Sequence, residues 1–177
     1  FLDEHDVVEY GDHLTFSGHE GHFYELLPIP FTAGAVARVA DRINRVQDLL
    51  GRRITIENAS YYCAPGQRLS ETEFLNGVLE AADCRLLLDV NNVYVNHVNH
   101  AAYDPATFIA SLDTDRIAYL HIAGHERVAD DLAIDTHGEP VPDPVYEILR
   151  ATYRRHGVLP TLLQPDGNLP PIAEPPA

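Results

Sequence analysis

The sequence predicts an α/β fold built on a parallel sheet, and three observations lead to this prediction. Short apolar segments alternate along the chain with segments of helical periodicity. Most of the apolar segments end in a polar side chain. The chain has 177 residues, 45% of them hydrophobic, which suffices for a single domain spanning residues 1–177. Strands joined by helical crossovers occur in doubly wound sheets and in (β/α) barrels, and the pattern fits both.

The first strand and helix are placed by their ends. Residues 7–16 are a strand candidate that ends near His13. After Thr32, apolar residues recur at helical spacing, which predicts a helix. Thr32 can cap the start of this helix, and Gly51 marks its end. A helix is therefore expected at residues 32–50.

The next strand and helix have equally local signals. The segment "RITIE", residues 53–57, is a short strand candidate that ends in Glu57. Ser70 followed by Glu73 three positions later is a capping box, which predicts a helix that runs to about Ala82.

The segment "RLLLD", residues 85–89, is the most apolar strand candidate and ends in Asp89. Its continuous leucine run is typical of a strand buried on both faces. A turn is expected after Asp89. Asp104 followed by proline begins a helix that reaches about Leu112, since proline suits the first helical turn.

The last part of the chain continues the alternation. Strands are expected at residues 116–121, 132–135 and 160–164, and a helix at Pro144–Arg155. A proline-rich tail follows the last strand.

The residues at the strand ends form the main functional signal. In both candidate folds, functional residues collect at the carboxyl ends of the strands. Six residues are found there: His13, Glu57, Asp89, His121, Asp135 and Gln164. All of them except Gln164 are typical metal ligands. Imidazole and carboxylate together suit iron, manganese or zinc, whereas calcium and magnesium prefer oxygen ligands.

Local spacing adds two candidate ligands. Asn92 lies three residues after Asp89, so both can reach one centre, although a strand-end aspartate can also cap a helix. Asp135 and His137 fall on the same side of an extended segment. Four other histidines are expected not to be ligands: His19, His22, His125 and His156.

Composition excludes several classes of function. The formal charge of −15 disfavours binding to nucleic acid, and no apolar run is long enough to span a membrane. We expect a cytoplasmic protein. Cys63 and Cys84 form no zinc-binding pattern, and Cys84, which leads into an apolar strand, is expected to be buried.

Seven segments together resemble one known family. They are "DHLTFSG", "LLPIPFT", "ITIENASYY", "LLLDVNNVYVNHVNH", "YLHIAGH", "IDTHGEPVPDPV" and "TLLQPDGNLPP". In this order they resemble the multinuclear non-heme iron-dependent oxidative enzymes, which are TIM barrels of the xylose-isomerase-like type. The resemblance implies two or three iron ions, dioxygen, and oxidation of a side chain, often cysteine, in a ribosomally made precursor peptide. A small partner protein that holds the leader peptide is also implied.

The resemblance also implies roles for individual residues. His13, Glu57, Asp89 and His121 would bind a central pair of irons, with Glu57 as the bridge. Asn92, Asp135 and His137 would bind a third iron.

The chain departs from the family pattern at two places. Gln164 stands where the family has glutamate, and a neutral amide is a weaker ligand. The chain also begins at the family's expected third strand, so the first two strand–helix units and one ligand histidine are expected to be absent. A fragment, a barrel completed by another chain, and a shortened relative all fit. Two other functions stay open: a divalent-metal isomerase or phosphodiesterase on the same fold, and a non-catalytic relative that only binds a partner.

Overall fold

The computed structural model describes residues 1–23 and 26–169. Within this range the chain forms two compact units. The first comprises Phe1–Leu88 and Leu112–Ala118, and the second comprises Asp89–Ser111 and the chain from Tyr119 onward. Most of the proline-rich tail lies outside the described residues.

A mixed α/β architecture with a parallel sheet is present, as predicted. The sheet has the strand order β1-β2-β3-β4-β7. The pairs β1–β2, β2–β3 and β4–β7 are parallel. The strands are β1 (Gly11–His13), β2 (Thr55–Glu57), β3 (Arg85–Asp89), β4 (Ile117–Ile122) and β7 (Thr161–Leu163).

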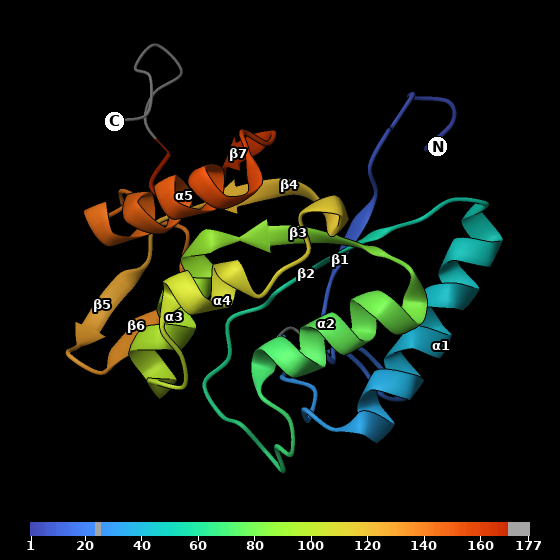
Figure 1. Ribbon diagram of the computed structural model, residues 1–177, viewed down its shortest axis with the longest axis horizontal. Helices are drawn as coiled ribbons and strands as arrows, with labels where there is room; N and C mark the ends of the chain where they lie inside the picture. The colour runs from blue at the N-terminus through green and yellow to red at the C-terminus, as the bar shows by residue number, and fades with distance from the viewer. Residues whose placement is uncertain (24–25, 170–177) are drawn as a thin grey trace. The chain divides into compact units, whose positions relative to one another are not determined.

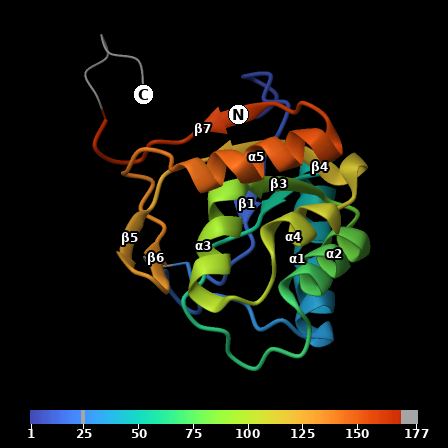
Figure 2. The same ribbon diagram turned by 60° about the vertical axis from the view of Figure 1, so that its left-hand side comes forward.

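The helices of the first unit begin at the predicted caps. In α1 (Ala33–Leu50) the Thr32 hydroxyl accepts a hydrogen bond from the Ala35 amide, and Gly51 ends the helix at φ 63°. That left-handed backbone is one that glycine adopts without steric penalty. In α2 (Glu71–Ala82) the Ser70 side chain and the Glu73 side chain form the reciprocal capping box. The two helices lie side by side (Figures 1 and 2). A 3-10 turn, η1 (Thr114–Arg116), also belongs to this unit.

Apolar side chains of the strands and helices form the core of the first unit. Leu86 and Leu88 of β3 and Val78 of α2 are fully buried. Phe31, which precedes α1, stacks on Phe74 of α2 with ring centroids 4.8 Å apart. Burial of each such side chain contributes on the order of 1.5–3 kcal/mol, so this packing holds α2 in place.

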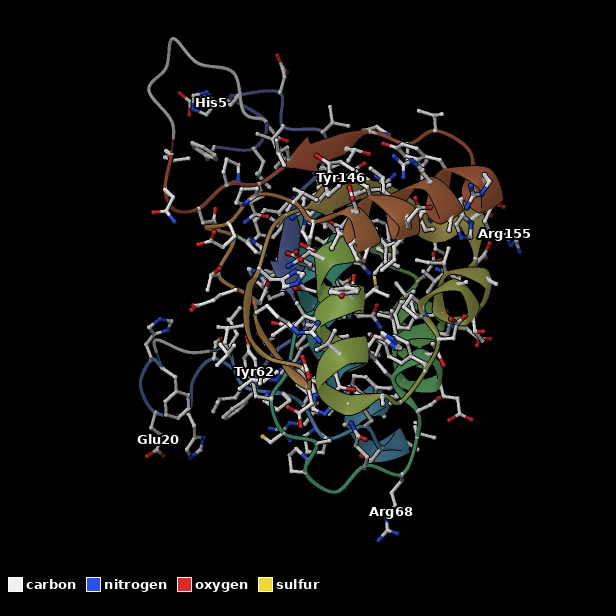
Figure 3. All side chains as sticks on the ribbon, turned by 90° about the vertical axis from the view of Figure 1, so that its left-hand side faces the viewer. His5, Glu20, Tyr62, Arg68, Tyr146 and Arg155 are labelled. Atoms are coloured by element: carbon white, nitrogen blue, oxygen red, sulfur yellow. The ribbon has the colours of Figure 1, made fainter. Side chains whose placement is uncertain are left out.

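Among its described residues, the second unit contains three helices and a hairpin. They are α3 (Val90–His100), α4 (Pro105–Ala110), α5 (Asp143–His156), β5 (Glu126–Ala129) and β6 (Leu132–Ile134). Helix α3 packs against α4, α5 and β6 (Figure 2). On the last turn of α5, Arg155 points away from the protein (Figure 3), whereas the next residue, His156, is buried and bonds the Ile109 carbonyl at 3.0 Å.

Three sequence predictions are wrong in detail. The segment at residues 132–135 was expected in the parallel sheet, but β6 pairs antiparallel with β5, a strand that was not predicted. The strand expected at residues 7–16 is only three residues long. Residues 90–100, where only a turn was expected, form α3. Within the described part of the chain, no helix has the length and apolar character required to cross a membrane.

Candidate metal centre

In the first unit, the ends of β1 and β2 bring two predicted ligands together. His13 and Glu57 are register partners in the parallel pair. The His13 Nε2 atom lies 3.4 Å from Glu57 Oε2. The Glu57 side chain is 7% exposed, whereas that of His13 is 46% exposed. A buried carboxylate beside an accessible imidazole is a suitable start for a metal site.

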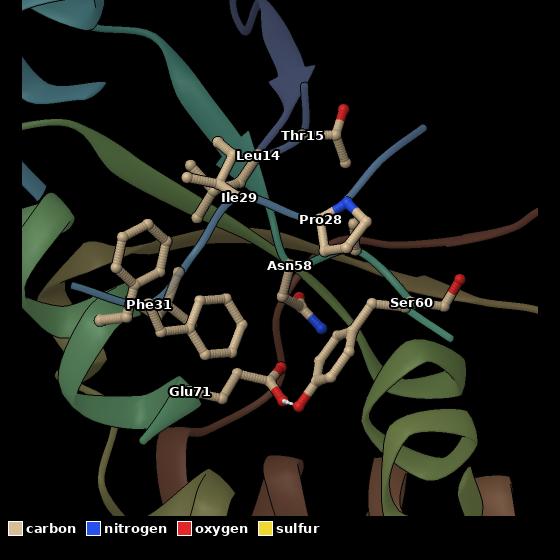
Figure 4. Close-up of a pocket in the computed structure, with 12 residues that line it drawn as sticks. Leu14, Thr15, Pro28, Ile29, Phe31, Asn58, Ser60 and Glu71 are labelled. Carbon is tan, nitrogen blue, oxygen red and sulfur yellow. Dashed lines mark hydrogen bonds between the residues drawn. The ribbon is translucent and has the colours of Figure 1, made fainter. Parts of the chain in front are cut away.

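Two hollows of the first unit lie near these residues. The larger hollow has a volume of about 1110 Å³, which includes the solvent at its open mouth, and His13 is one of its lining residues. The smaller, about 370 Å³, has apolar walls that include Ile29 and Phe31 (Figure 4). Within it the Tyr61 hydroxyl donates to Glu71 Oε2 at 3.1 Å, and burial together with this carboxylate raises the pKa of Tyr61. No predicted metal ligand lines the smaller hollow.

The second unit contains the other predicted ligands, of which Asp89 is the first along the chain. It is fully buried, and its Oδ1 atom accepts a hydrogen bond from the Asn92 amide at 2.8 Å, so it caps α3. The capping role considered from the sequence is therefore correct. It does not exclude metal binding, because a carboxylate has a second oxygen. A carboxylate oxygen of Asp89 and a ring nitrogen of His121 lie within 4.8 Å of each other. The Asn92 side chain is buried in the first turn of α3.

His137 lies between two carboxylates. Its Nε2 atom is 2.8 Å from Asp135 Oδ1, and its Nδ1 atom is 3.1 Å from Asp166 Oδ2. Burial alone would lower the pKa of His137. The contact with and charge of Asp135, together with the charges of Asp89 and Asp166, outweigh burial and raise that pKa to about 9. Two carboxylates thus contact one imidazole and the charge of a third acts on it, so the group favours a positive charge at its centre.

The backbone also fixes His137. Its φ of 50° lies in the left-handed region, which is uncommon for a residue with a side chain. The backbone at His137 is therefore not extended as expected, although Asp135 and His137 do lie on the same side, with their side chains in contact. The Asp166 amide donates to the His137 carbonyl at 2.8 Å, and Asn168 donates to the Gly138 carbonyl at 2.8 Å.

Gly124 allows a close approach within the same unit. A Cβ atom at this position would lie 1.8 Å from the Glu139 carbonyl oxygen and 2.8 Å from the Pro140 carbonyl oxygen. Glycine is therefore required for the chain after β4 to pass beside the segment that follows His137.

Three residues of this group were missed by the sequence analysis. Asn91 donates to Asp135 Oδ1 at 2.7 Å, and His125, which was expected not to be a ligand, bonds Asn91 Oδ1 at 2.8 Å. Asp166 bonds both His137 and the amide nitrogen of Gln164, the latter at 3.0 Å. In the sequence, Asn91 could be noticed as part of the asparagine pair that follows Asp89, and Asp166 by its position two residues after Gln164.

Gln164 meets the group through its amide. Its Nε2 atom donates to Asp166, and its Oε1 atom is buried without a hydrogen-bond partner among the residues that the structure describes. An unpartnered buried carbonyl oxygen is costly unless another group, such as a metal ion, satisfies it. Carboxylates, imidazoles and this oxygen form a donor set that fits a divalent first-row transition metal.

Comparison with known proteins identifies relatives over nearly the whole chain. Residues 1–175 match the family described as RiPP precursor modification enzyme MbnB/TglH/ChrH, where RiPP denotes a ribosomally made, modified peptide. Proteins named UPF0276 protein are similar: 53% identical in Shewanella sediminis, 55% in Nitrosospira multiformis and 49% in Pseudomonas aeruginosa. Each alignment covers 98% of this chain, but only 61–62% of the relative. The chain thus spans about three fifths of the length of these relatives.

Proposed function

Because the chain belongs to the family of RiPP precursor modification enzymes MbnB/TglH/ChrH, we propose that it contributes to the iron- and dioxygen-dependent oxidation of a side chain in a precursor peptide. Cysteine is the proposed target. The observation that carries the proposal is the contact of His137 with both Asp135 and Asp166, in a group where the charge of Asp89 also acts on the ring.

The charges of this group support a metal ion. Three carboxylates with one imidazole leave an excess of negative charge that a divalent cation would neutralise. Asp166 can hold the His137 ring from its Nδ1 side, which leaves Nε2 for the metal, as is usual for histidine ligands. We propose that Asp135 and His137, with Asn92, bind one iron.

The remaining predicted ligands complete the proposal. We propose that His13, Glu57, Asp89 and His121 bind a pair of irons, with Glu57 as the bridge, because a carboxylate offers two oxygens. The pairing of His13 with Glu57 and that of Asp89 with His121 support this assignment. We further propose that the parallel sheet is part of a (β/α) barrel of the TIM type.

Iron, when bound, would supply redox chemistry and activate dioxygen. The task of the protein is to hold the ligands rigidly and to keep the site closed to bulk water, and the burial of Asp89 and Glu57 serves both. The proposed partners are the precursor peptide and a small protein that holds its leader. The proposed location is the cytoplasm.

Metal content and peptide mass test the proposal together. The chain is reconstituted with Fe(II) without oxygen, and bound iron is measured in the wild type and in Asp135→Ala. Asp131→Ala is the matched control, because Asp131 is an exposed acid only four residues away. We expect two or three irons in the wild type and in the control, and at least one fewer in Asp135→Ala.

Activity is tested by expressing the chain together with a cysteine-containing precursor peptide encoded beside it. A mass change in the peptide that requires iron and dioxygen supports the proposal. Stoichiometric zinc or manganese without iron would instead favour an isomerase or phosphodiesterase. Wild-type metal content in Asp135→Ala would remove the proposed third site.

A further inference from the structure

We propose that Asn91 and His125 form a positioning pair that holds the Asp135 carboxylate in the orientation required for metal binding. Neither residue is a predicted ligand. The inference rests on the proposed metal site and adds to it the hydrogen bonds that orient one of its ligands.

The chemistry of the three side chains fixes the direction of every hydrogen bond. Ionised Asp135 can only accept, so the group that faces its Oδ1 atom at 2.7 Å must be the NH₂ of Asn91. The oxygen of the same amide then faces His125, whose Nδ1 atom lies 2.8 Å away. That nitrogen must carry a proton. The chain of donors therefore runs from His125 through Asn91 to Asp135.

Burial makes this order strict. Asn91 is fully buried in the first turn of α3, and His125 is 8% exposed. Water cannot easily replace either hydrogen bond, so a reversed amide would bring two acceptors together at Asp135 and two donors together at His125. Burial, and next the charge of Arg127, lowers the pKa of His125, which favours the neutral ring. A neutral ring has one N–H, and the geometry assigns it to Nδ1.

The ring of His125 is itself held in place. It packs against Tyr94 of α3, with centroids 5.1 Å apart at an angle of 33°. The ring and the amide are thus both anchored to α3, the helix that Asp89 caps. The pair transfers the rigidity of this helix to Asp135, which lies beyond the end of β6 and has no helix or strand of its own.

Two variants of His125 separate positioning from packing. Asparagine places its NH₂ near the position of Nδ1 and can still donate to Asn91, whereas leucine fills similar space without a donor. The matched control is His156→Leu, because His156 is also buried in this unit, and its Nε2 atom bonds a backbone carbonyl of α4. The probe is Co(II), added without oxygen, because its visible absorption reports on the number and geometry of its ligands. The thermal unfolding of each metal-free variant is measured in parallel.

We expect His125→Leu to weaken Co(II) binding about 10–100-fold, the range found when partners of metal ligands are removed, and to change the absorption spectrum. His125→Asn should restore both to near the wild-type values. The control should unfold at a lower temperature and keep the wild-type spectrum and affinity. Wild-type affinity and spectrum in His125→Leu would overturn the positioning role. Equal loss in His125→Leu and His156→Leu, in proportion to their loss of stability, would overturn it as well.

The direction of the hydrogen bonds is tested without metal by the ¹⁵N NMR shifts of the histidine rings. We expect a proton on Nδ1 of His125 and, as an internal contrast, on Nε2 of His156, which faces the Ile109 carbonyl. A proton on Nε2 of His125 would overturn the proposed pair. Because this measurement uses the wild type, it decides the question even if a variant fails to fold. A wild type that binds no Co(II) or iron, with the expected protonation, would contradict the metal site, and the positioning role would fall with it.

Discussion

Replacing Gly124 by alanine is expected to damage the candidate metal centre from outside its ligand set. The new Cβ atom would lie 1.8 Å from the Glu139 carbonyl oxygen and 2.5 Å from its carbon. Since these are backbone atoms, no side-chain rotation relieves the clash, and the segment must move by roughly 1 Å or more. Overpacking of this kind costs about 1–3 kcal/mol of the free energy of unfolding. The segment that moves begins two residues after His137.

Urea unfolding and Fe(II) titration of the same samples test this prediction. We expect Gly124→Ala to lower the free energy of unfolding by about 1–3 kcal/mol and to bind iron more weakly. The control is Gly77→Ala in α2, where the new Cβ would lie 3.5 Å from the Val36 methyl groups, an ordinary contact. Because alanine is the better helix former by about 1 kcal/mol, this control should be at least as stable as the wild type. Wild-type unfolding and iron affinity in Gly124→Ala would refute the close-approach argument.

Three further predictions concern other parts of the chain. Ser70→Ala should lower the free energy of unfolding by about 1 kcal/mol in urea, because the Glu73 amide loses its cap; no change would mean that the box adds nothing. Alkylation with iodoacetamide at pH 8 should label exposed Cys63 and spare Cys84, whose pKa burial raises to about 11; rapid labelling of both would contradict the buried core. Glu57→Ala should lower bound iron by more than one equivalent, as a bridging ligand requires, and full iron content in this variant would exclude the bridge.

Local signals predicted the helices well. The caps at Thr32, Ser70 and Asp104 are where the sequence places them, because a cap depends on residues within one turn. The buried leucine strand was equally clear. Helix α3 was missed because its asparagines and β-branched valines have low helix propensity, and tertiary packing of Asn91 and Asn96 stabilises it instead.

Strand partners were harder to predict than strands. Residues 132–134 read correctly as a strand, but three residues contain no information on whether the neighbour is parallel or antiparallel. The actual partner, β5, is exposed along its whole length and therefore lacks the apolar signal by which strands are recognised.

The site was predicted in part for similar reasons. Strand-end residues such as His13 and Glu57 lie together because parallel strands in register end at the same level. The association of His137 with Asp166 depends on a loop contact between residues 29 positions apart, and on a left-handed backbone that no local pattern indicates. The sequence therefore indicated the type of chemistry and many of the proposed ligands, but not the side chains that orient them.

A crystal structure of the chain loaded with iron, with anomalous diffraction recorded at the iron edge, tests the central claim most directly. We expect an iron peak in contact with Asp135 and the Nε2 atom of His137, and a further peak, or a pair of peaks, at Asp89 and His121. Iron found only at exposed histidines such as His5, or no iron at these ligands under saturating Fe(II), would contradict the proposed metal centre.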